Sequence, residues 1–168
     1  LFTIPVEETD LTREFSPAPF VPQNQSERDR RCEEILMIQA MGLKKRLVHT
    51  NSRTAVVGIS GGLDSTLALL VTAKAFDMAG KKREDIIAVT MPCFGTTDRT
   101  YQNACRMSVK LGATLKEVRI ADAVQTHFRD IGHDEEVHDV TYENSQARER
   151  TQVLMDIANQ EWGMVIGT

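Results

Sequence analysis

TAVVGISGGLDST, at residues 54–66, is the most informative stretch of the 168-residue chain. Its first six residues, 54–59, are β-branched or apolar apart from one glycine, which is typical of a strand buried on both faces. Gly61 and Gly62 follow closely and permit a tight turn. Apolar residues then recur at helical spacing as far as Met78. The stretch therefore predicts a buried strand, a tight turn and a helix.

The same alternation of strand and helix continues along the chain. Further apolar strands are predicted at 86–91, 115–120 and 164–168. Helices are predicted from Ser26 to about Val48, from Asp98 to about 111 and from about 141 to 162, with Gly80 and Gly112 ending the second and third helices of the chain. Apolar strands alternating with helices predict an α/β fold, in which a parallel sheet carries helices on both faces. Ligands bind such folds at the edge where the strand-to-helix loops gather.

The N-terminal part of the chain departs from this pattern. Four of the five prolines lie in the first 22 residues, so residues 1–25 are predicted to be an extended arm or linker. A disordered leader is the alternative, although Phe15, Phe20 and Val21 favour an arm that lies against a surface. Order begins at Ser26, which Asp29 follows at capping-box spacing. Residues 26–168 are predicted to form the domain.

Composition excludes several classes of protein. The formal net charge of −4 argues against a broad nucleic-acid-binding face, and 41% hydrophobic residues are enough for a core. No stretch without charged residues is long enough to span a bilayer, and the first ten residues lack the basic region of a signal peptide. Three cysteines without CxxC spacing disfavour a disulfide scaffold and fit a reducing cytosol. We therefore expect a cytoplasmic protein without a membrane segment.

The turn after the first strand has the chemistry of an anion site. The glycines let a ligand approach the backbone, and the start of the following helix favours negative charge through its N–H groups and its dipole. Neither GxxxxGK[ST] nor GxGxxG is present. A carboxylate at Asp64 would repel a bare phosphate, which suggests a divalent cation between them. The alternative is a purely structural turn in which Asp64 or Ser65 caps the helix.

The loop and several other segments resemble a known family. SGGLDS after a strand is similar to the pyrophosphate-binding loop of the ATP pyrophosphatase (PP-loop) enzymes. MPCFGTTDRT at 91–100, YENSQARER at 142–150 and the terminal IGT resemble NAD synthetase. The stretch FVPQNQSERDRRCEEILMIQAMGLKKRL resembles the glutamine-dependent kind most closely. The resemblance covers residues 20–168 and implies a Rossmann-like fold of the adenine nucleotide alpha hydrolase type.

The resemblance also implies that segments of the family's pattern are missing. Glutamine-dependent members carry an amidase domain before this region. In the family the terminal GT continues into GDLSE, whose glutamate helps hold the metal, and then into a segment that covers the substrate. We therefore expect a synthetase ATP-binding domain that is truncated on its C-terminal side, a fragment with little activity alone.

NAD synthetases are ligases, and the resemblance implies their reaction. ATP adenylates the nicotinate carboxylate of deamido-NAD and releases pyrophosphate, and ammonia then displaces AMP. The ammonia is free or derived from glutamine. The implied ATP-binding residues are Gly58, Ile59, Ser60, Gly61, Gly62, Leu63, Asp64, Ser65 and Thr168. Asp64 is the implied Mg²⁺ ligand. No general base or covalent nucleophile is assigned, and Cys93 is interpreted as a packing residue.

Two residues of the next motif are candidates for binding deamido-NAD. Asn144 and Arg148 are four residues apart and share a helix face, where an amide and a fixed cation suit a carboxylate or phosphate. The alternative is an ordinary exposed helix face. In the family this substrate lies at a dimer interface, which implies at least a homodimer. His127, His133 and His138 have spacings that do not suit one metal site, and the acids around them suggest a solvated loop.

Two alternatives to the amide-forming synthetase stay open. The first is a nucleotide-binding, self-associating module that is inactive alone. Among enzymes, the alternative is another PP-loop ligase, such as a GMP synthetase or a tRNA-thiolating enzyme, although the net charge weakly disfavours tRNA.

Overall fold

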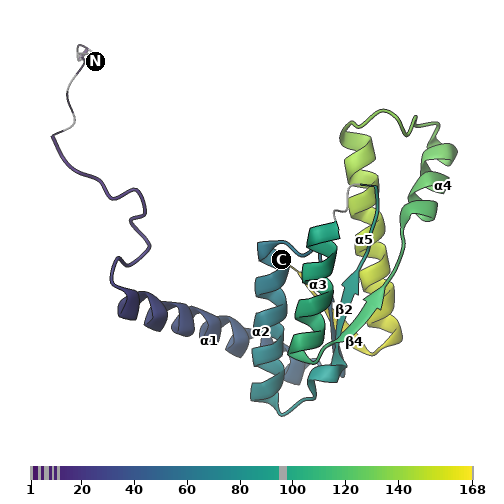
Figure 1. Cartoon of the computed structure of the whole chain (residues 1–168), viewed down its shortest axis with the longest axis horizontal. Helices are drawn as coiled ribbons and strands as arrows, with labels where there is room; N and C mark the ends of the chain where they lie inside the picture. Colours follow the sequence, from purple (N-terminus) through teal and green to yellow (C-terminus); the bar gives the residue numbers. More distant parts are fainter. Residues whose placement is uncertain are drawn as a thin grey trace. The chain divides into compact units, whose positions relative to one another are not determined.

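The computed structural model describes residues 12–94 and 98–167, together with residues 2, 3, 5, 8 and 10. The chain divides into two compact units, residues 1–35 and residues 36–168 (Figure 1). Helix α1 (Gln25–His49) begins in the first unit and ends in the second.

In the first unit, two arginines of α1 hold the preceding segment. Arg28 donates to the carbonyl oxygens of Pro22 and Gln23, at 3.2 and 3.3 Å, and Arg31 donates to that of Phe20 at 3.0 Å. The Asn24 side chain caps the helix by accepting from the Ser26 N–H at 2.9 Å. The predicted start at Ser26 is therefore wrong by one residue, because Asn24 supplies the cap. That the arm lies against a surface stays a prediction.

The second unit contains a four-stranded parallel sheet. Its strands are β1 (Thr54–Gly58), β2 (Ile86–Thr90), β3 (Thr114–Glu117) and β4 (Gly163–Ile166), in the order β3-β2-β1-β4. β1 is thus an inner strand, and Val57 lies between Ala88 of β2 and Ile166 of β4. The predicted parallel sheet is confirmed.

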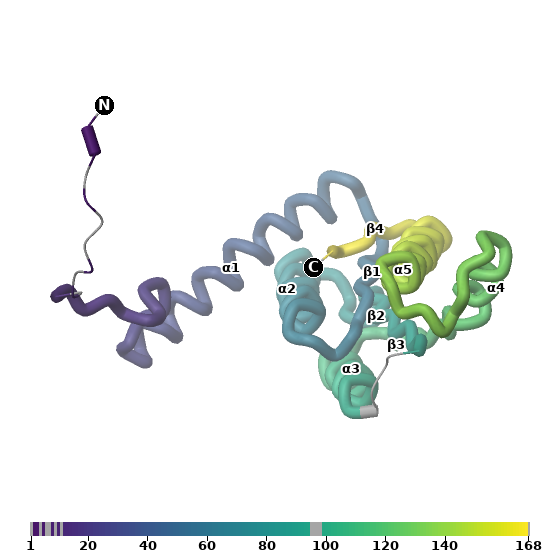
Figure 2. Tube along the Cα trace, turned by 90° about the horizontal axis from the view of Figure 1, so that it is seen from above, coloured from purple at the N-terminus to yellow at the C-terminus, as the bar shows by residue number. Residues whose placement is uncertain are grey.

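Helices cover both faces of this sheet, as predicted (Figure 2). On one face, α2 (Leu63–Ala79), α3 (Asp98–Leu111) and the C-terminal half of α1 pack against Ala55 and Val57. On the other face, α4 (Ala121–Ile131) and α5 (Val140–Gln160) pack against Val56. Alternate residues of β1 therefore enter different cores, and the strand is apolar throughout for that reason.

Helix α4 corrects the predicted solvated loop between the third strand and the last helix. Its buried residues Val124 and Phe128 share a face with the buried Ile120 that precedes it. Gly132 ends the helix in the left-handed conformation, at φ 70°. The polar side chains of this segment form the exposed face of a helix, and only the residues after Gly132 form a loop.

Other element boundaries differ from prediction by a few residues. β3 ends at Glu117 rather than at Ile120, which lies just before α4. α5 begins at Val140 because the Asp139 carboxylate accepts hydrogen bonds from the N–H groups of Thr141 and Tyr142, at 2.8 and 3.0 Å. These hydrogen bonds lower the pKa of Asp139, and the one from the Tyr142 N–H has the largest effect. Gly80 and Gly112 adopt left-handed backbone at the ends of α2 and α3, as predicted.

No helix among the described residues combines the length and the apolar character needed to span a bilayer.

The edge strand β4 approaches β1 closely at Gly163. Gly163 is paired with Thr54, and a Cβ built at Gly163 would overlap the Thr54 hydroxyl and lie 2.8 Å from its carbonyl oxygen. The Thr54 hydroxyl also donates to the carbonyl oxygen of Glu161 at 3.0 Å, so it has little freedom to move away. Strand β4 therefore requires glycine at this position.

We expect Gly163→Ala to lower the free energy of unfolding by roughly 1–3 kcal/mol, the usual cost of overpacking. Urea denaturation measures this loss. Gly42→Ala is the matched control, because a Cβ at Gly42 of α1 meets no atom within 4 Å. The control should leave stability unchanged or raise it by about 0.5–1 kcal/mol, since alanine is the better helix former. Equal effects of the two substitutions would contradict the steric account.

Candidate functional site

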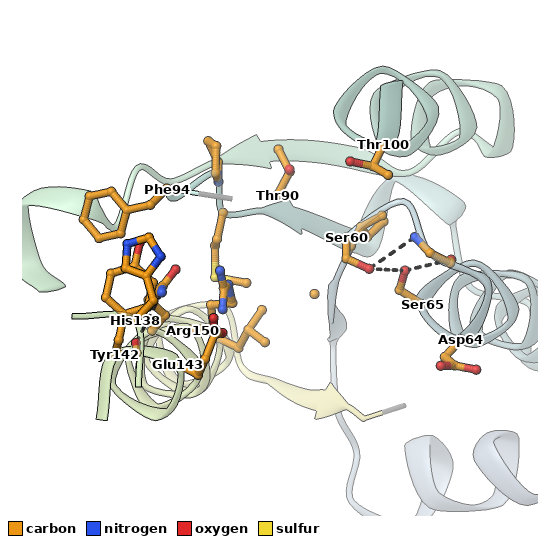
Figure 3. Close-up of a pocket in the computed structure, with 17 residues that line it drawn as sticks. Ser60, Asp64, Ser65, Thr90, Phe94, Thr100, His138, Tyr142, Glu143 and Arg150 are labelled. Carbon is orange, nitrogen blue, oxygen red and sulfur yellow. Dashed lines mark hydrogen bonds between the residues drawn. The ribbon is translucent and has the colours of Figure 1, made fainter. Parts of the chain in front are cut away.

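A cavity of about 800 Å³ opens at the carboxyl edge of the sheet, where ligands bind parallel α/β folds (Figure 3). Its walls come from segments that are distant in sequence. The loop after β1 and the first turn of α2 line one side, and the end of β2 with the residues after it lines a second. His138 and residues 142–154 of α5 line a third, and Thr100 of α3 contributes one more lining residue. In Figure 3, Ser60, Ser65 and Asp64 lie across the cavity from Tyr142, Glu143 and Arg150.

The loop after β1 is held in place by backbone contacts. Gly61 has a φ of +81°, and a Cβ built there would overlap the carbonyl oxygen of Thr100 in α3. Glycine is therefore required both by the conformation and by the close approach to α3. Before it, the Ile59 N–H donates to the Val89 carbonyl oxygen at 2.8 Å, which extends the pairing of β1 and β2 to the mouth of the loop.

Hydroxyl groups connect the two ends of this loop. The Gly62 N–H donates to Ser60 Oγ at 3.2 Å, and Ser60 Oγ lies 3.1 Å from Ser65 Oγ. Ser65 Oγ also donates to the Gly62 carbonyl oxygen at 3.2 Å. Ser65 is buried, whereas Ser60 is exposed toward the cavity. The ring of contacts fixes the turn and places a hydroxyl group at the cavity surface.

The start of α2 gives this side of the cavity a positive potential. Gly62 is the N-cap residue and provides no side-chain cap. The N–H groups in the first turn of a helix lack partners within the helix, and the helix dipole adds partial positive charge there. An anion such as a phosphate is favoured at this position.

Asp64 lies in the first turn of α2 and lines the same cavity. Its side chain is exposed, and in the described part of the chain no three side chains of the metal-binding kinds form a cluster. On this side of the cavity the described residues offer a divalent cation one carboxylate, that of Asp64. That is enough for Mg²⁺ only when phosphate oxygens and water complete the coordination, which is the usual arrangement for this ion.

The face of α5 that packs on the sheet continues into the cavity. Ile157 is buried against the sheet and Leu154 packs beside it; Arg150, Gln146 and Glu143 follow toward the start of the helix at helical spacing. Leu154 Cδ1 lies 2.9 Å from the position that a Cβ at Gly58 would take, so the helix closely approaches the end of β1. Beyond the sheet the apolar stripe becomes polar, and these polar groups line the cavity.

Aromatic rings form the outer part of this wall. The His138 ring stacks on Tyr142 with centroids 4.2 Å apart, and the centroids of Phe94 and Tyr142 are 5.8 Å apart. Tyr142 also stacks on the buried Phe128 of α4 at 5.7 Å. Burial raises the pKa of Tyr142. These contacts join the loop before α5 to the end of β2.

The structure places most of the predicted ATP-binding residues at the cavity. Its lining includes Gly58, Ile59, Ser60, Gly62, Asp64 and Ser65. Gly61 and Leu63 are not among the lining residues: Gly61 shapes the loop by its contact with α3, and Leu63 is 84% exposed. Thr168 lies outside the described residues. The assignment of these residues to ATP stays a prediction.

The predicted deamido-NAD residues lie on another face of α5. Asn144 and Arg148 are exposed and do not line the cavity, and Arg148 donates to Ser145 Oγ at 3.4 Å. Their role stays a prediction. The same helix turns contribute Glu143, Gln146 and Arg150 to the cavity instead. These three lining residues were not predicted from the sequence, although their helical spacing from Leu154 and Ile157 was a signal for them.

The remaining candidates have different surroundings. His127 belongs to α4, the His133 ring packs on Phe128 at 4.9 Å, and His138 lines the cavity. Cys93 is half-buried behind the lining, and burial raises the pKa of its thiol. A raised pKa disfavours the thiolate, which agrees with the interpretation of Cys93 as a packing residue.

Comparison with known proteins identifies close sequence relatives. The chain is 44% identical to a glutamine-dependent NAD(+) synthetase of Mycobacterium leprae, over 98% of this chain and 25% of the relative. It is 33% identical to an NH(3)-dependent NAD(+) synthetase of Thermoplasma acidophilum, over 69% of this chain and 45% of the relative. The chain thus spans about a quarter of the length of the glutamine-dependent relative.

Solved structures show the same fold. A glutamine-dependent NAD+ synthetase from Acinetobacter baumannii, in complex with adenosine diphosphate, superposes with a TM-score of 0.73 at 26% identity. That alignment covers 81% of this chain and 26% of the other. An NH3-dependent NAD synthetase from Campylobacter jejuni superposes with a TM-score of 0.70 at 24% identity, over 81% of this chain and 56% of the other.

The family comparison agrees with both results. The model of the family described as NAD synthase matches residues 35–168, which include every strand of the sheet and every lining residue of the cavity. This chain therefore belongs to the NAD synthase family.

Proposed function

We propose that this chain supplies the ATP-binding part of an NAD synthetase, a ligase that converts deamido-NAD to NAD. The observation that carries the proposal is the loop at residues 58–65, which lines the cavity and joins it to the uncapped start of α2. The relative from Acinetobacter baumannii was solved with adenosine diphosphate, and this supports an adenine nucleotide as the ligand.

The proposed reaction has two steps. In the first, a carboxylate oxygen of the nicotinate attacks the α-phosphorus of ATP, the bond from this phosphorus to the bridging oxygen breaks, and pyrophosphate leaves. In the second, ammonia attacks the acyl carbon, the bond from this carbon to the AMP oxygen breaks, and AMP leaves while the nitrogen loses a proton. The ammonia is supplied as such or from glutamine, since relatives of both kinds are similar to this chain.

The residues of the loop act on the first step. Negative charge grows on the leaving pyrophosphate, and fixed N–H donors at the start of α2 would stabilise it without having to reorganise. The Ser60 hydroxyl adds a donor at the cavity surface. Asp64 would hold Mg²⁺ together with phosphate oxygens and water, and the ion would neutralise further charge there.

Substrate choice is tested by offering several acceptors. The chain is mixed with ATP, Mg²⁺ and ammonium, and pyrophosphate release is measured with deamido-NAD, with xanthosine monophosphate or with tRNA. We expect release with deamido-NAD alone. Release that depends on xanthosine monophosphate or tRNA would instead indicate one of the other PP-loop ligases.

Asp64→Ala should weaken ATP binding much more in the presence of Mg²⁺ than in its absence, because only the metal-bridged contact is lost. Calorimetry with and without Mg²⁺ measures both affinities. Asp122→Ala is the matched control, since Asp122 is likewise an acid in the first turn of a helix but does not line the cavity. Equal losses with and without Mg²⁺ would contradict the metal role of Asp64.

Arg148→Ala should weaken deamido-NAD binding by about 1.5–3 kcal/mol, the scale of a charge-assisted hydrogen bond, if Arg148 contacts an anionic part of that substrate. ATP affinity should hardly change, because Arg148 lies outside the cavity. Titration of each ligand separately makes this comparison. Equal weakening of both ligands would point to a folding defect or to a different site.

The proposal also includes self-association of the chain into at least a dimer. Asn144 and Arg148 are exposed on α5, so a ligand bound there is accessible to a second copy of the chain. Sedimentation at several protein concentrations, with and without deamido-NAD, measures the oligomeric state. We expect at least a dimer.

A further inference from the structure

The cavity has an uneven distribution of charged side chains. Among its described lining residues, Asp64 and Glu143 are acidic, and Arg150 is the only arginine or lysine. Arg150 lies on α5, across the cavity from Ser60 and Ser65 (Figure 3). A ligand with several anionic groups would therefore find hydrogen-bond donors on two opposite walls, the N–H groups at the start of α2 and this guanidinium, while the two carboxylates leave Arg150 as the one fixed positive charge of the described lining.

Arg150 is positioned by the packing of its helix. It lies one turn before Leu154, which approaches Gly58 at the end of β1. Its side chain is half-buried, and among the described residues its guanidinium has no hydrogen-bond acceptor and no ion-pair partner; its one recorded electrostatic effect is on the neighbouring Cys93 thiol, whose pKa it lowers against the larger effect of burial. Partial burial of a guanidinium that has no acceptor costs free energy, and a bound anion would recover it.

The apolar lining determines which anionic group comes close to Arg150. The side chains of Met91 and Leu154 converge above Gly58, and Phe94 lies farther out on the same wall (Figure 3). In Figure 3, Phe94 lies across the cavity from Ser60 and Ser65 at the start of α2, and Met91 and Leu154 meet at the end of β1. A nucleoside triphosphate with its terminal phosphates at α2 would place its base against these apolar groups, and its α-phosphate, which links the two ends, beside α5.

We propose that Arg150 binds the α-phosphate of ATP and keeps this phosphate bound in the acyl-adenylate and in AMP. The inference rests on the proposed function. It separates two roles: the loop at the start of α2 binds the pyrophosphate that leaves, and Arg150 binds the phosphate that stays with the nucleoside. The planar guanidinium donates two parallel hydrogen bonds to two oxygens of one phosphate, which a lysine cannot do.

The two products of ATP cleavage test this division of roles. AMP and inorganic pyrophosphate are titrated separately into the wild type, Arg150→Ala and Arg150→Lys. We expect Arg150→Ala to weaken AMP binding by about ten- to a hundredfold, the effect of one charge-assisted contact, and to change pyrophosphate binding by less than about threefold. Arg150→Lys should recover part of the loss, because it keeps the charge without the paired geometry.

Arg106→Ala is the matched control, because Arg106 is an exposed arginine within α3 that does not line the cavity. Its affinities for both products should equal those of the wild type, and thermal unfolding confirms that each variant is folded. Unchanged AMP affinity in folded Arg150→Ala, or equal losses of AMP and pyrophosphate, would overturn the inference. Wild-type protein that binds neither ATP nor AMP would instead overturn the proposed function.

Discussion

The contact between Gly61 and the backbone of Thr100 is the constraint on which the cavity depends. At this point the loop after β1 meets the first turn of α3, and no room remains for a side chain. The turn therefore presents backbone groups to the cavity, with Ser60 before it and Ser65 after it. The direction of α2 follows from the same contact, because its N-cap residue is the next glycine. The positive end of α2 is thus aimed by packing against α3.

The fold could be predicted from sequence where burial dominates. β1 and β2 have apolar residues on both faces, and both were located correctly because few other structures fit such a run. β3 has only one partly buried residue and three exposed ones, so its sequence gives a weak signal and its end was misplaced. Helix α4 was missed because six of its eleven residues are polar and only Val124 and Phe128 are large apolar residues at its buried positions. The spacing of these two, with Gly132 behind them, is nevertheless helical.

The candidate site also has one part that could be predicted from the sequence and one part that could not. The loop could be located because two adjacent glycines between a strand and a helix have a local explanation. The opposite wall could not, because it depends on how α5 is rotated about its own axis. That rotation is set by Ile157 and Ala158 packing on the sheet, at the far end of the helix from the cavity. Asn144 and Arg148 have suitable chemistry, but the packing turns them away from the cavity, and Glu143, Gln146 and Arg150 face it.

The position of β4 in the sheet has a consequence for biosynthesis. β1, β2 and β3 follow one another in the chain and can pair as soon as they leave the ribosome, since helical crossovers join them. β4 pairs with the other edge of β1, although Thr54 and its partner Gly163 are 109 residues apart in the sequence. Until that long loop closes, at an entropic cost, one edge of β1 is open to pairing with other chains. The nascent chain is therefore most exposed to aggregation between the synthesis of β1 and the arrival of β4.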